Sequence, residues 1–345
     1  MPLVAKIFVG LVVILSLGSG AAAYYINFVL DKATIVNADT EDIYIPVSQE
    51  VFEQDEKKED AIEIDPEEVL WGKLSKLAKK EEDVVNILLV GEEDLGEEEN
   101  GRGRTDCMMI ATISKKENAL KLTSLMRDMY VQIPGYSDNK LNAAYRNGGM
   151  SLLEDTIELN FGVAVDGYVL VDFDAFESVI DALGGVEIKL SEIEANYLNS
   201  HNYISKKKYR NVKPGKQILN GNQARGYSRI RYVRTANGLT DDWGRNHRQR
   251  KVLKAIFKEY KSKSAVELVA MLPDIMKLVT TDLSKKDMLG YIGLILSINA
   301  DKLQTLSVPV EGSFTTPYIN GMSVLLSSLE TNQEKLHQFL FGTEQ

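Results

Sequence analysis

The hydrophobic positions of this 345-residue chain begin with one long apolar run near its start. Residues 7–30 contain no charged side chain, and at about 1.5 Å per residue a helix of this length crosses a bilayer core of about 30 Å. Lys6 precedes the run and Asp31 follows it. The pattern therefore predicts a signal-anchor transmembrane helix within residues 1–32, with a cytoplasmic N-terminus and the rest of the chain outside. A cleaved signal peptide is the alternative, since three alanines stand at residues 21–23.

Residues 33–83 show a different pattern, with many acids and few large apolar side chains. Ten acids and two lysines lie between Glu50 and Glu68, which gives a local charge of −8. This charge density favours a solvated, extended segment, so we expect an acidic extracytoplasmic stalk. Near its end, five apolar residues fit one short amphipathic helix that packs on the following domain: Val69, Leu70, Trp71, Leu74 and Leu77.

From residue 84 onward, short apolar runs and helical patterns are mixed. Val84–Gly91 is an apolar run that ends in glycine, which is typical of a buried strand. Further strands are expected at 108–113, 120–125, 167–173, 186–190 and 303–309. Helices are expected at 148–159, 174–183, 243–260, 265–279, 285–298 and 322–341. Because strict β–α–β alternation is absent, the pattern predicts one α/β domain over residues 84–345, with a mixed central β-sheet sandwiched by α-helices.

Composition excludes several classes of protein. The chain is 44% hydrophobic and 26% charged, which excludes global disorder and a polytopic membrane protein. A single cysteine excludes an internal disulfide framework and a cysteine-rich metal site, and three distant histidines disfavour a histidine zinc site. The net charge of −10 hides a segregation, because residues 50–68 and 81–99 carry −8 and −9 and the remainder carries +7 (−10 + 17).

The positive charge is concentrated between Arg225 and Lys254, where nine arginines and lysines face only Asp241 and Asp242. An arginine-rich stretch of this kind suggests an anionic ligand. A solvated, salt-bridged surface helix is the alternative, and it is also the expected use of the lysine run that begins at Lys206. A DNA-binding regulator is a further alternative, but the predicted topology places the domain outside the membrane, so we expect no nucleic-acid partner.

The spacing of these arginines indicates a diphosphate site. In an extended Arg-x-Arg, the side chains of Arg229 and Arg231 point to the same face. In the helix expected next, Arg245, Arg248 and Gln249 are three and four residues apart and share a face. Guanidinium groups bind phosphate oxygens bidentately, and a helix start adds free N–H groups. Ordinary surface salt bridges are the alternative.

Four acids in or near these motifs are candidate metal ligands, because Mg²⁺ binds through one or two carboxylates plus phosphate oxygens. They are Glu93, Asp94, Asp106 and Asp242. Neutralisation of neighbouring arginines explains the same acids equally well. The chain has no P-loop, no G-x-G-x-x-G that opens a helix and no G-x-S-x-G, so the diphosphate would not belong to a typical nucleotide.

A series of short motifs follows along the chain: Asn86–Gly91, Gly103–Met109, Arg127-Asp128, Ile133–Tyr136, Lys140–Tyr145, Val171–Phe173, Asp181–Val186, Leu219–Gly221 and the arginine-rich segment. In their order and spacing, these motifs resemble the LytR-CpsA-Psr family of cell-wall glycopolymer ligases. The resemblance runs from about residue 84 to about residue 342, and it rests on order and spacing because each motif alone is weak.

The resemblance implies transfer of a polyprenyl-diphosphate-linked glycopolymer, such as wall teichoic acid or capsule, to a muramic-acid hydroxyl of peptidoglycan, which forms a phosphodiester. It implies an extracytoplasmic domain that faces the cell wall and is anchored in the bilayer by the N-terminal helix. The lipid tail would lie in an apolar tunnel between sheet and helices, and Mg²⁺ or another divalent cation would be the cofactor. A non-catalytic polyprenyl-phosphate-binding or regulatory protein is the alternative, because the same arginines would serve it.

Carried over by motif, the diphosphate ligands would be Arg104, Arg127, Arg229, Arg231, Arg245 and Gln249, with Arg248 and Lys140 as further candidates. Arg127 and Asp106 are the catalytic candidates. Arginine and the metal would stabilise the transition-state charge, and Asp106 would accept the hydroxyl proton unless it binds the metal instead. Asp106 with Asp94 or Glu93 would hold Mg²⁺, and Asp242 would orient the arginines or bind metal.

The chain departs from the family pattern at four places without losing any of these phosphate ligands. Cys107 stands where the family has threonine, and Met126 where it has proline. Arg225-Gly226 replaces a small apolar pair, and His247 replaces an acid or amide. These departures leave the choice of metal ligands open.

Overall fold

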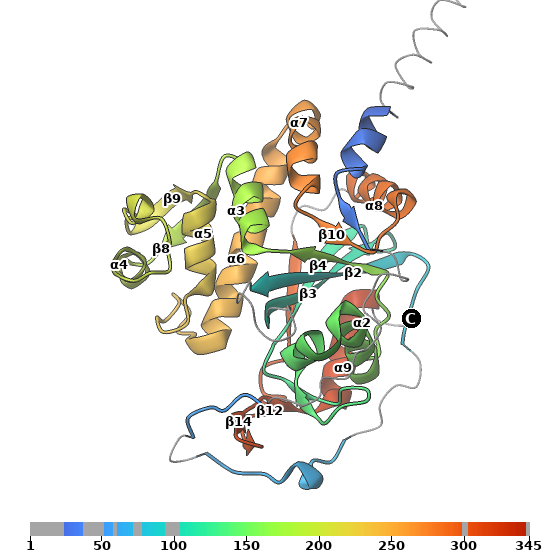
Figure 1. Ribbon diagram of the computed structural model, residues 1–345, viewed down its shortest axis with the longest axis vertical. Coiled ribbons are helices and arrows are strands. Elements are labelled where there is room, and N and C mark those ends of the chain that lie inside the picture. The colour runs from blue at the N-terminus through green and yellow to red at the C-terminus, as the bar shows by residue number, and fades with distance from the viewer. Residues whose placement is uncertain are drawn as a thin grey trace, which may run out of the picture.

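The computed structural model describes residues 24–36, 52–57, 61–71, 78–93, 104–298 and 303–342. Its centre is a mixed seven-stranded sheet with helices on both faces, as the sequence predicts (Figure 1). In sheet order, the strands are β1 (Thr34–Ile35), β10 (Thr280–Thr281), β7 (Gly167–Val171), β2 (Val84–Glu93), β3 (Arg104–Ser114), β4 (Ala119–Leu125) and β11 (Gln304–Val308). The predicted strands within 84–125, at 167–173 and at 303–309 are confirmed.

The apolar run of β2 is buried on both faces, and its alternate residues enter two different cores. Leu88 and Val90 face the helices α2 (Leu141–Phe161) and α9 (Leu329–Phe341). Ile87 and Leu89 face the opposite layer. The helices that line that layer are α3 (Phe173–Ala182), α6 (Asp241–Ser262), α7 (Ala265–Met276) and α8 (Lys285–Ser297).

A smaller unit packs beside the sheet around its own apolar cluster. It consists of β8 (Val186–Leu190), β9 (Gly215–Leu219), α4 (Glu192–Ser200), η2 (Lys207–Tyr209) and α5 (Gly221–Arg229). The extended Arg229-x-Arg231 predicted from sequence is wrong, because Arg229 is the last residue of α5. The start of α5 is fixed by a capping box between Asn220 and Gln223, a signal the apolar pattern does not carry.

The C-terminal helix predicted at 322–341 begins only at Leu329. Before it lie two small antiparallel pairs, β12 (Phe314–Thr315) with β15 (Leu326–Ser327) and β13 (Tyr318–Ile319) with β14 (Met322–Ser323). Asn320 and Gly321 both have positive φ, which suits a tight hairpin turn and prevents a helix there. A further pair joins β5 (Tyr130–Val131) to β6 (Asn139–Lys140).

Residues 24–30 form a helical segment that packs on the domain. Val29 and Leu30 are buried beside Met276 and Met288, and β1 pairs in parallel with β10. Among the described residues, no helix has the length and apolar character needed to cross a bilayer. Residues 1–23 of the predicted anchor lie outside the described part, so the anchor and the domain boundaries at 32 and 83 stay predictions.

The described parts of the expected stalk lie against the domain, which differs from the solvated segment expected there. We name residues 52–57 and 61–71 the pre-domain segment; it includes η1 (Pro66–Glu68). Ile64 N–H donates to the Tyr318 carbonyl at 3.0 Å, and Tyr318 N–H donates to the Ile62 carbonyl at 2.7 Å. Trp71 stacks on Tyr130 with ring centroids 5.8 Å apart. Its few apolar side chains thus pack the segment against the domain. Residues 72–77 of the expected amphipathic helix lie outside the described residues.

Candidate functional site

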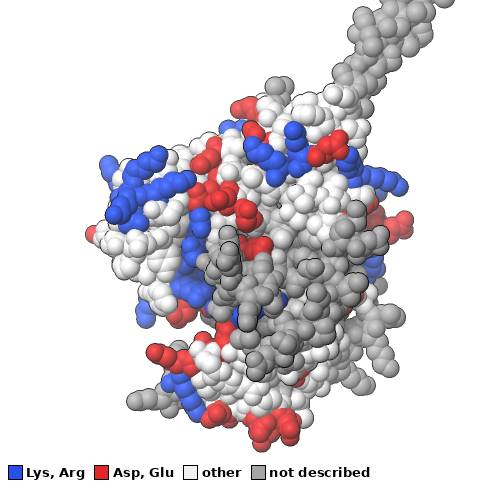
Figure 2. Space-filling view, in the orientation of Figure 1, with Lys and Arg blue, Asp and Glu red and all other residues white. Residues whose placement is uncertain are grey.

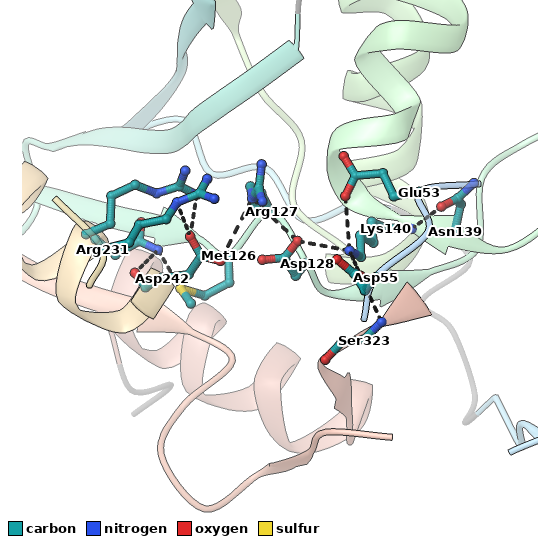
Figure 3. Close-up of polar contacts among 12 residues, drawn as sticks. Glu53, Asp55, Met126, Arg127, Asp128, Asn139, Lys140, Arg231, Asp242 and Ser323 are labelled. Atoms are coloured by element: carbon teal, nitrogen blue, oxygen red, sulfur yellow. Dashed lines mark hydrogen bonds and ion pairs between the residues drawn. The ribbon is translucent and has the colours of Figure 1, made fainter. Parts of the chain in front are cut away.

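The candidate site forms where four chain segments meet at one edge of the sheet (Figure 3). One of them, the connection between α5 and α6, supplies Arg231. β4 ends at Leu125 and leads directly into Arg127 and Asp128. The first turn of α6 supplies Asp242 and Arg245, and β6 ends in Lys140. Segments far apart in sequence therefore bring charged side chains to one place, which we call the arginine cluster: Arg127, Arg231 and Arg245 around Asp242.

Asp242 is the centre of this cluster. Its Oδ1 lies 2.8 Å from Arg245 Nη2 and 3.2 Å from Arg231 Nε, and its Oδ2 lies 4.0 Å from Arg127 Nε. Burial acts to raise the pKa of Asp242, but the charge of Arg245 and the other guanidinium groups outweighs it and lowers the pKa to about 2. The carboxylate stays ionised and contacts three arginines, and its predicted role, to orient them or to bind metal, stays a prediction.

Asp128 is the second carboxyl group of the site. Its Oδ1 lies 3.4 Å from Arg127 Nε and 3.6 Å from Lys140 Nζ. Burial raises the pKa of Asp128 to about 6, and a hydrogen bond to the neighbouring Asp242 acts in the same direction. Asp128 can therefore exchange a proton near neutral pH, whereas Asp242 cannot.

Lys140, predicted as a diphosphate ligand, is instead surrounded by acids. It is 2% exposed, and its Nζ lies 2.7 Å from Asp55 Oδ2 and 3.1 Å from Glu53 Oε2. With Asp128 as the third carboxylate, its charge is neutralised by protein groups. Lys140 thus holds the pre-domain segment against the site (Figure 3).

Arg248 is also placed differently from the prediction. Its side chain is fully buried, and its Nε donates to Glu194 at 2.9 Å. Its Nη groups donate to the carbonyls of Ile230 and Val233 at 3.1 and 2.7 Å. Arg248 therefore fixes the connection between α5 and α6, and its guanidinium is not available to a diphosphate.

The remaining predicted ligands on these helices lie around the cluster. The Arg229 guanidinium lies 5.0 Å from the Phe173 ring centroid, and Arg225 lies over the same ring at 4.3 Å. Gln249 is one turn beyond Arg245 on α6, and its buried Oε1 accepts no hydrogen bond from the described residues.

Of the predicted metal ligands, Glu93 and Asp106 can be placed only by their backbone. Glu93 pairs with Arg104 at the end of β2, and Asp106 precedes Met108, which pairs with Leu125 of β4. Asp106 and Arg127 therefore continue past the same edge on adjacent strands, so the register suits the predicted convergence. The side chains of Glu93, Arg104 and Asp106, and all of Asp94, lie outside the described structure. Within it, no three histidine, cysteine or acidic residues form a metal-type group, and the Asp242 carboxylate contacts arginines.

Two cavities lie along the elements that carry the arginine cluster, α6 and the end of β4. The first, of about 530 Å³, lies between the sheet and α3, α6, α7 and α8 and is lined almost wholly by apolar side chains such as Leu89, Leu122 and Phe257. The family resemblance implies an apolar tunnel for the lipid tail in this place, between sheet and helices. The second, of about 760 Å³, adjoins Asp128 and Asp242 on the other side.

Sequence reasoning missed the pre-domain acids Glu53 and Asp55, as well as Trp243 in the second cavity. The two acids lie in a run of ten, and nothing in the local sequence distinguishes them from their neighbours. Their signal is the ion pair with Lys140, more than 80 residues away, which only the fold brings together.

Comparison with known proteins gives matches over most of the chain. The model of the LytR_cpsA_psr family matches residues 44–339. The regulatory protein MsrR of Staphylococcus aureus (strain COL) is 30% identical over 266 residues, which cover 76% of each chain. The polyisoprenyl-teichoic acid–peptidoglycan teichoic acid transferase TagU of Enterococcus faecalis (strain ATCC 700802 / V583) is 33% identical over 247 residues, 69% of this chain and 76% of TagU.

Among solved structures, the LytR-CPS2A-psr family protein YwtF (TagT) with bound octaprenyl pyrophosphate lipid is similar to this fold. The TM-score is 0.55 and the identity 26%, over 78% of this chain and 97% of that one.

Proposed function

The chain belongs to the LytR_cpsA_psr family, and we propose that it transfers a polyprenyl-diphosphate-linked glycopolymer to a peptidoglycan hydroxyl, forming a phosphodiester. The observation that carries this proposal is the arginine cluster beside an apolar cavity. TagU is named as a transferase of this kind, and the YwtF structure holds an octaprenyl pyrophosphate.

The donor would lie along α6. Arg245 and Gln249 occupy the first turns of that helix, and Leu253, Ile256 and Phe257 follow on the wall of the first cavity. At about 1.5 Å per residue, the step from residue 245 to residue 253 is about 12 Å. A diphosphate held by the arginines can therefore continue directly into an isoprenoid tail in the cavity.

In the proposed reaction, an acceptor hydroxyl attacks the glycan-side phosphorus and the lipid phosphate leaves. Negative charge grows on the phosphoryl oxygens, and the preorganised guanidinium groups stabilise it. Asp128 joins Asp106 as a candidate proton acceptor, because it lies beside Arg127 and its pKa is near neutral.

We propose in addition that Glu93, Asp94 and Asp106 hold Mg²⁺, which supplies further positive charge at the phosphoryl oxygens. The backbone register that brings Asp106 next to the Arg127 edge supports this assignment. Treatment with EDTA is expected to stop transfer, and added Mg²⁺ is expected to restore it. Full transfer in EDTA would contradict this metal proposal alone.

We also propose that residues 7–30 anchor the chain in the cell membrane, with the domain facing the cell wall. The uncharged apolar run supports this topology. A C-terminal reporter that is active only in the cytoplasm would contradict it.

The function is tested with the full chain purified from a cell-wall-producing host. An organic extract is analysed by mass spectrometry for a co-purified polyprenyl phosphate, and transfer of a polyprenyl-diphosphate-linked glycan to peptidoglycan is then measured with Mg²⁺. Bound lipid together with transfer supports the proposal. The name of MsrR, a regulatory protein, favours a second candidate, a non-catalytic lipid-phosphate binder. Bound lipid without transfer would select that candidate, and neither lipid nor transfer would reject both.

A further inference from the structure

The second cavity, of about 760 Å³, lies between the pre-domain segment and the arginine cluster. Ile62 and Ile64 form one wall, and Tyr318 and Ser323 of the β13–β14 hairpin form another. Asp128, Asp242 and Trp243 line the side that faces the cluster. The cavity therefore opens onto the groups to which the transfer chemistry is assigned, and no role in binding the donor is assigned to it.

The two cavities lie on opposite sides of the arginines along two independent elements. On α6, residues 241–243 line the second cavity, the cluster follows at Arg245, and residues 253–260 line the first cavity. On β4, Leu120 and Leu122 line the first cavity, whereas Met126 and Asp128, just past the strand end, line the second. A ligand in the second cavity would thus reach the diphosphate from the side opposite the lipid.

This placement agrees with the geometry of phosphoryl transfer, in which the attacking and leaving oxygens lie roughly in line with phosphorus. The lipid phosphate leaves toward the apolar cavity. The nucleophile must then come from the other side, where the second cavity lies.

The lining of the second cavity suits a neutral, hydroxyl-rich ligand better than a second anion. Among the described residues that line it there are four acids and no lysine or arginine; the acids are Glu56, Asp128, Asp241 and Asp242. Carboxylates accept hydrogen bonds from hydroxyl groups but repel phosphate. Tyr318 and Thr316 add hydroxyl groups, and the Trp243 indole adds an amphipathic surface.

The wall formed by the pre-domain segment is held in place by a small set of contacts around Asp55 (Figure 3). Asp55 Oδ2 accepts from Lys140 Nζ at 2.7 Å and from Ser323 N–H at 2.9 Å. Tyr318 Oη donates to the Asp55 carbonyl at 2.6 Å. Because Lys140 also contacts Asp128, the same contacts fix the wall relative to the cluster.

We propose that the second cavity binds the acceptor glycan and that the pre-domain segment is part of this acceptor site, an inference that rests on the proposed transfer. The acceptor hydroxyl oxygen forms the new P–O bond, and the P–O bond to the lipid phosphate breaks with its electron pair on that leaving group. The hydroxyl proton passes to a carboxylate of the cavity. Asp55 and Lys140 are positioning residues, because they act by holding the wall.

The test compares two exposed isoleucines in the full chain. Ile62 lines the cavity and is 72% exposed, whereas Ile218, 59% exposed, lies on β9 of the smaller unit. Ile62→Trp is expected to raise the acceptor KM about tenfold or more and leave the donor KM unchanged, since a lost or crowded apolar contact changes binding by about 10–200-fold. Ile218→Trp is expected to change neither. An unchanged acceptor KM in Ile62→Trp, or a raised donor KM, would overturn the proposal.

A second pair of variants tests the wall. Asp55→Asn is expected to raise the acceptor KM, and Asp55→Glu is expected to restore it in part because the charge returns. Glu63→Gln removes an ion pair with Lys57 in the same segment and serves as the control. Equal effects of Asp55→Asn and Glu63→Gln would contradict the positioning role.

A binding measurement separates this inference from the transfer reaction. Ligand-observed NMR uses a soluble, uncharged disaccharide in which the lactyl carboxyl group of N-acetylmuramic acid is amidated. It is expected to show binding to the wild-type chain and to Ile218→Trp, and loss of binding in Ile62→Trp. This pattern without any transfer would refute the proposed function and keep the glycan site. Transfer with no disaccharide binding and no change in acceptor KM would refute the site alone.

Discussion

Two basic regions of the molecule use the same charge in different ways. The first is a lysine surface on the smaller unit, with Lys206, Lys207, Lys208, Lys213 and Lys216. All five are exposed, and basic side chains gather on that part of the surface (Figure 2). The second is the arginine cluster, whose Arg245 is only 2% exposed and lies against a carboxylate.

The difference teaches that the packing of positive charges around a shared carboxylate, rather than their number, distinguishes the arginine cluster. Exposed ammonium groups are solvated by water, and their ion pairs contribute little. The guanidinium of Arg245 is buried and those of Arg127 and Arg231 are partly buried, so they lose much of that water, and Asp242 balances their charge. We propose that they form a preorganised anion site and that the lysine surface does not.

The largest effect is expected when one arginine of the arginine cluster is removed. Arg127→Ala and Arg231→Ala are each expected to lower the rate of transfer by about 10²–10³-fold, because each removes a preorganised charge at the phosphoryl oxygens. Circular dichroism is expected to show an intact fold. Transfer at the wild-type rate in either variant would contradict the role of the cluster.

The next effect separates binding arginines from structural ones on the same helix. Arg248→Ala is expected to lower the free energy of unfolding by about 3–5 kcal/mol, because Glu194 is left buried without its partner. Lys258, the matched control on α6, pairs with the exposed Glu187 at 3.3 Å, and Lys258→Ala is expected to leave stability unchanged. Urea denaturation measures both; equal losses would contradict the distinction.

A smaller effect concerns pH. The pKa of Asp128 is raised to about 6 by burial, so above this pH the group is ionised and can accept a proton. Below it, Asp128 is protonated, and transfer is expected to fall about tenfold for each further pH unit, as for any single essential base. Asp128→Asn is expected to lower the rate of transfer at all pH values and to remove the fall in rate below pH 6. If Asp128→Asn still shows the same fall in rate below pH 6, that fall is caused by the titration of another group.

The smallest effect is expected at the lysine surface. Replacing Lys207, Lys208 and Lys213 together by alanine is expected to change transfer by no more than about twofold, since exposed substitutions usually act within about 0.5 kcal/mol. The transfer assay checks this directly. A loss comparable to that in Arg127→Ala would remove the contrast between the two regions.

Sequence reasoning succeeds where local pattern decides the structure. The apolar runs of β2, β3 and β4 are long enough to identify buried strands, and their ends locate the Arg127 edge. It fails where a partner distant in the sequence determines the position of a side chain. Arg245 and Arg248 are the same residue type three positions apart, but Glu194 and two carbonyls of another segment bury Arg248 away from the site.

Polar composition accounts for the other misses. The α5 segment has few apolar residues, so the hydrophobic pattern is silent there, although its capping box with Asn220 and Gln223 was readable. The motif of Lys140 predicts a diphosphate ligand, and only the fold reveals the acids that enclose it. The carboxylates that decide its role come from a region whose composition alone indicates a solvated stalk.

The packing of the pre-domain segment and β1 on the domain affects the choice of boundaries for an expression fragment. The apolar pattern suggests Val84 as the first residue of an expression fragment. Such a fragment would uncover Tyr130 where Trp71 stacks, free the edge of β10 where β1 pairs, and leave Lys140 buried beside Asp128 without Asp55. Unpaired sheet edges and exposed aromatic surface promote aggregation during purification. A fragment that starts at Tyr24 keeps these surfaces covered and is the better choice for crystallisation.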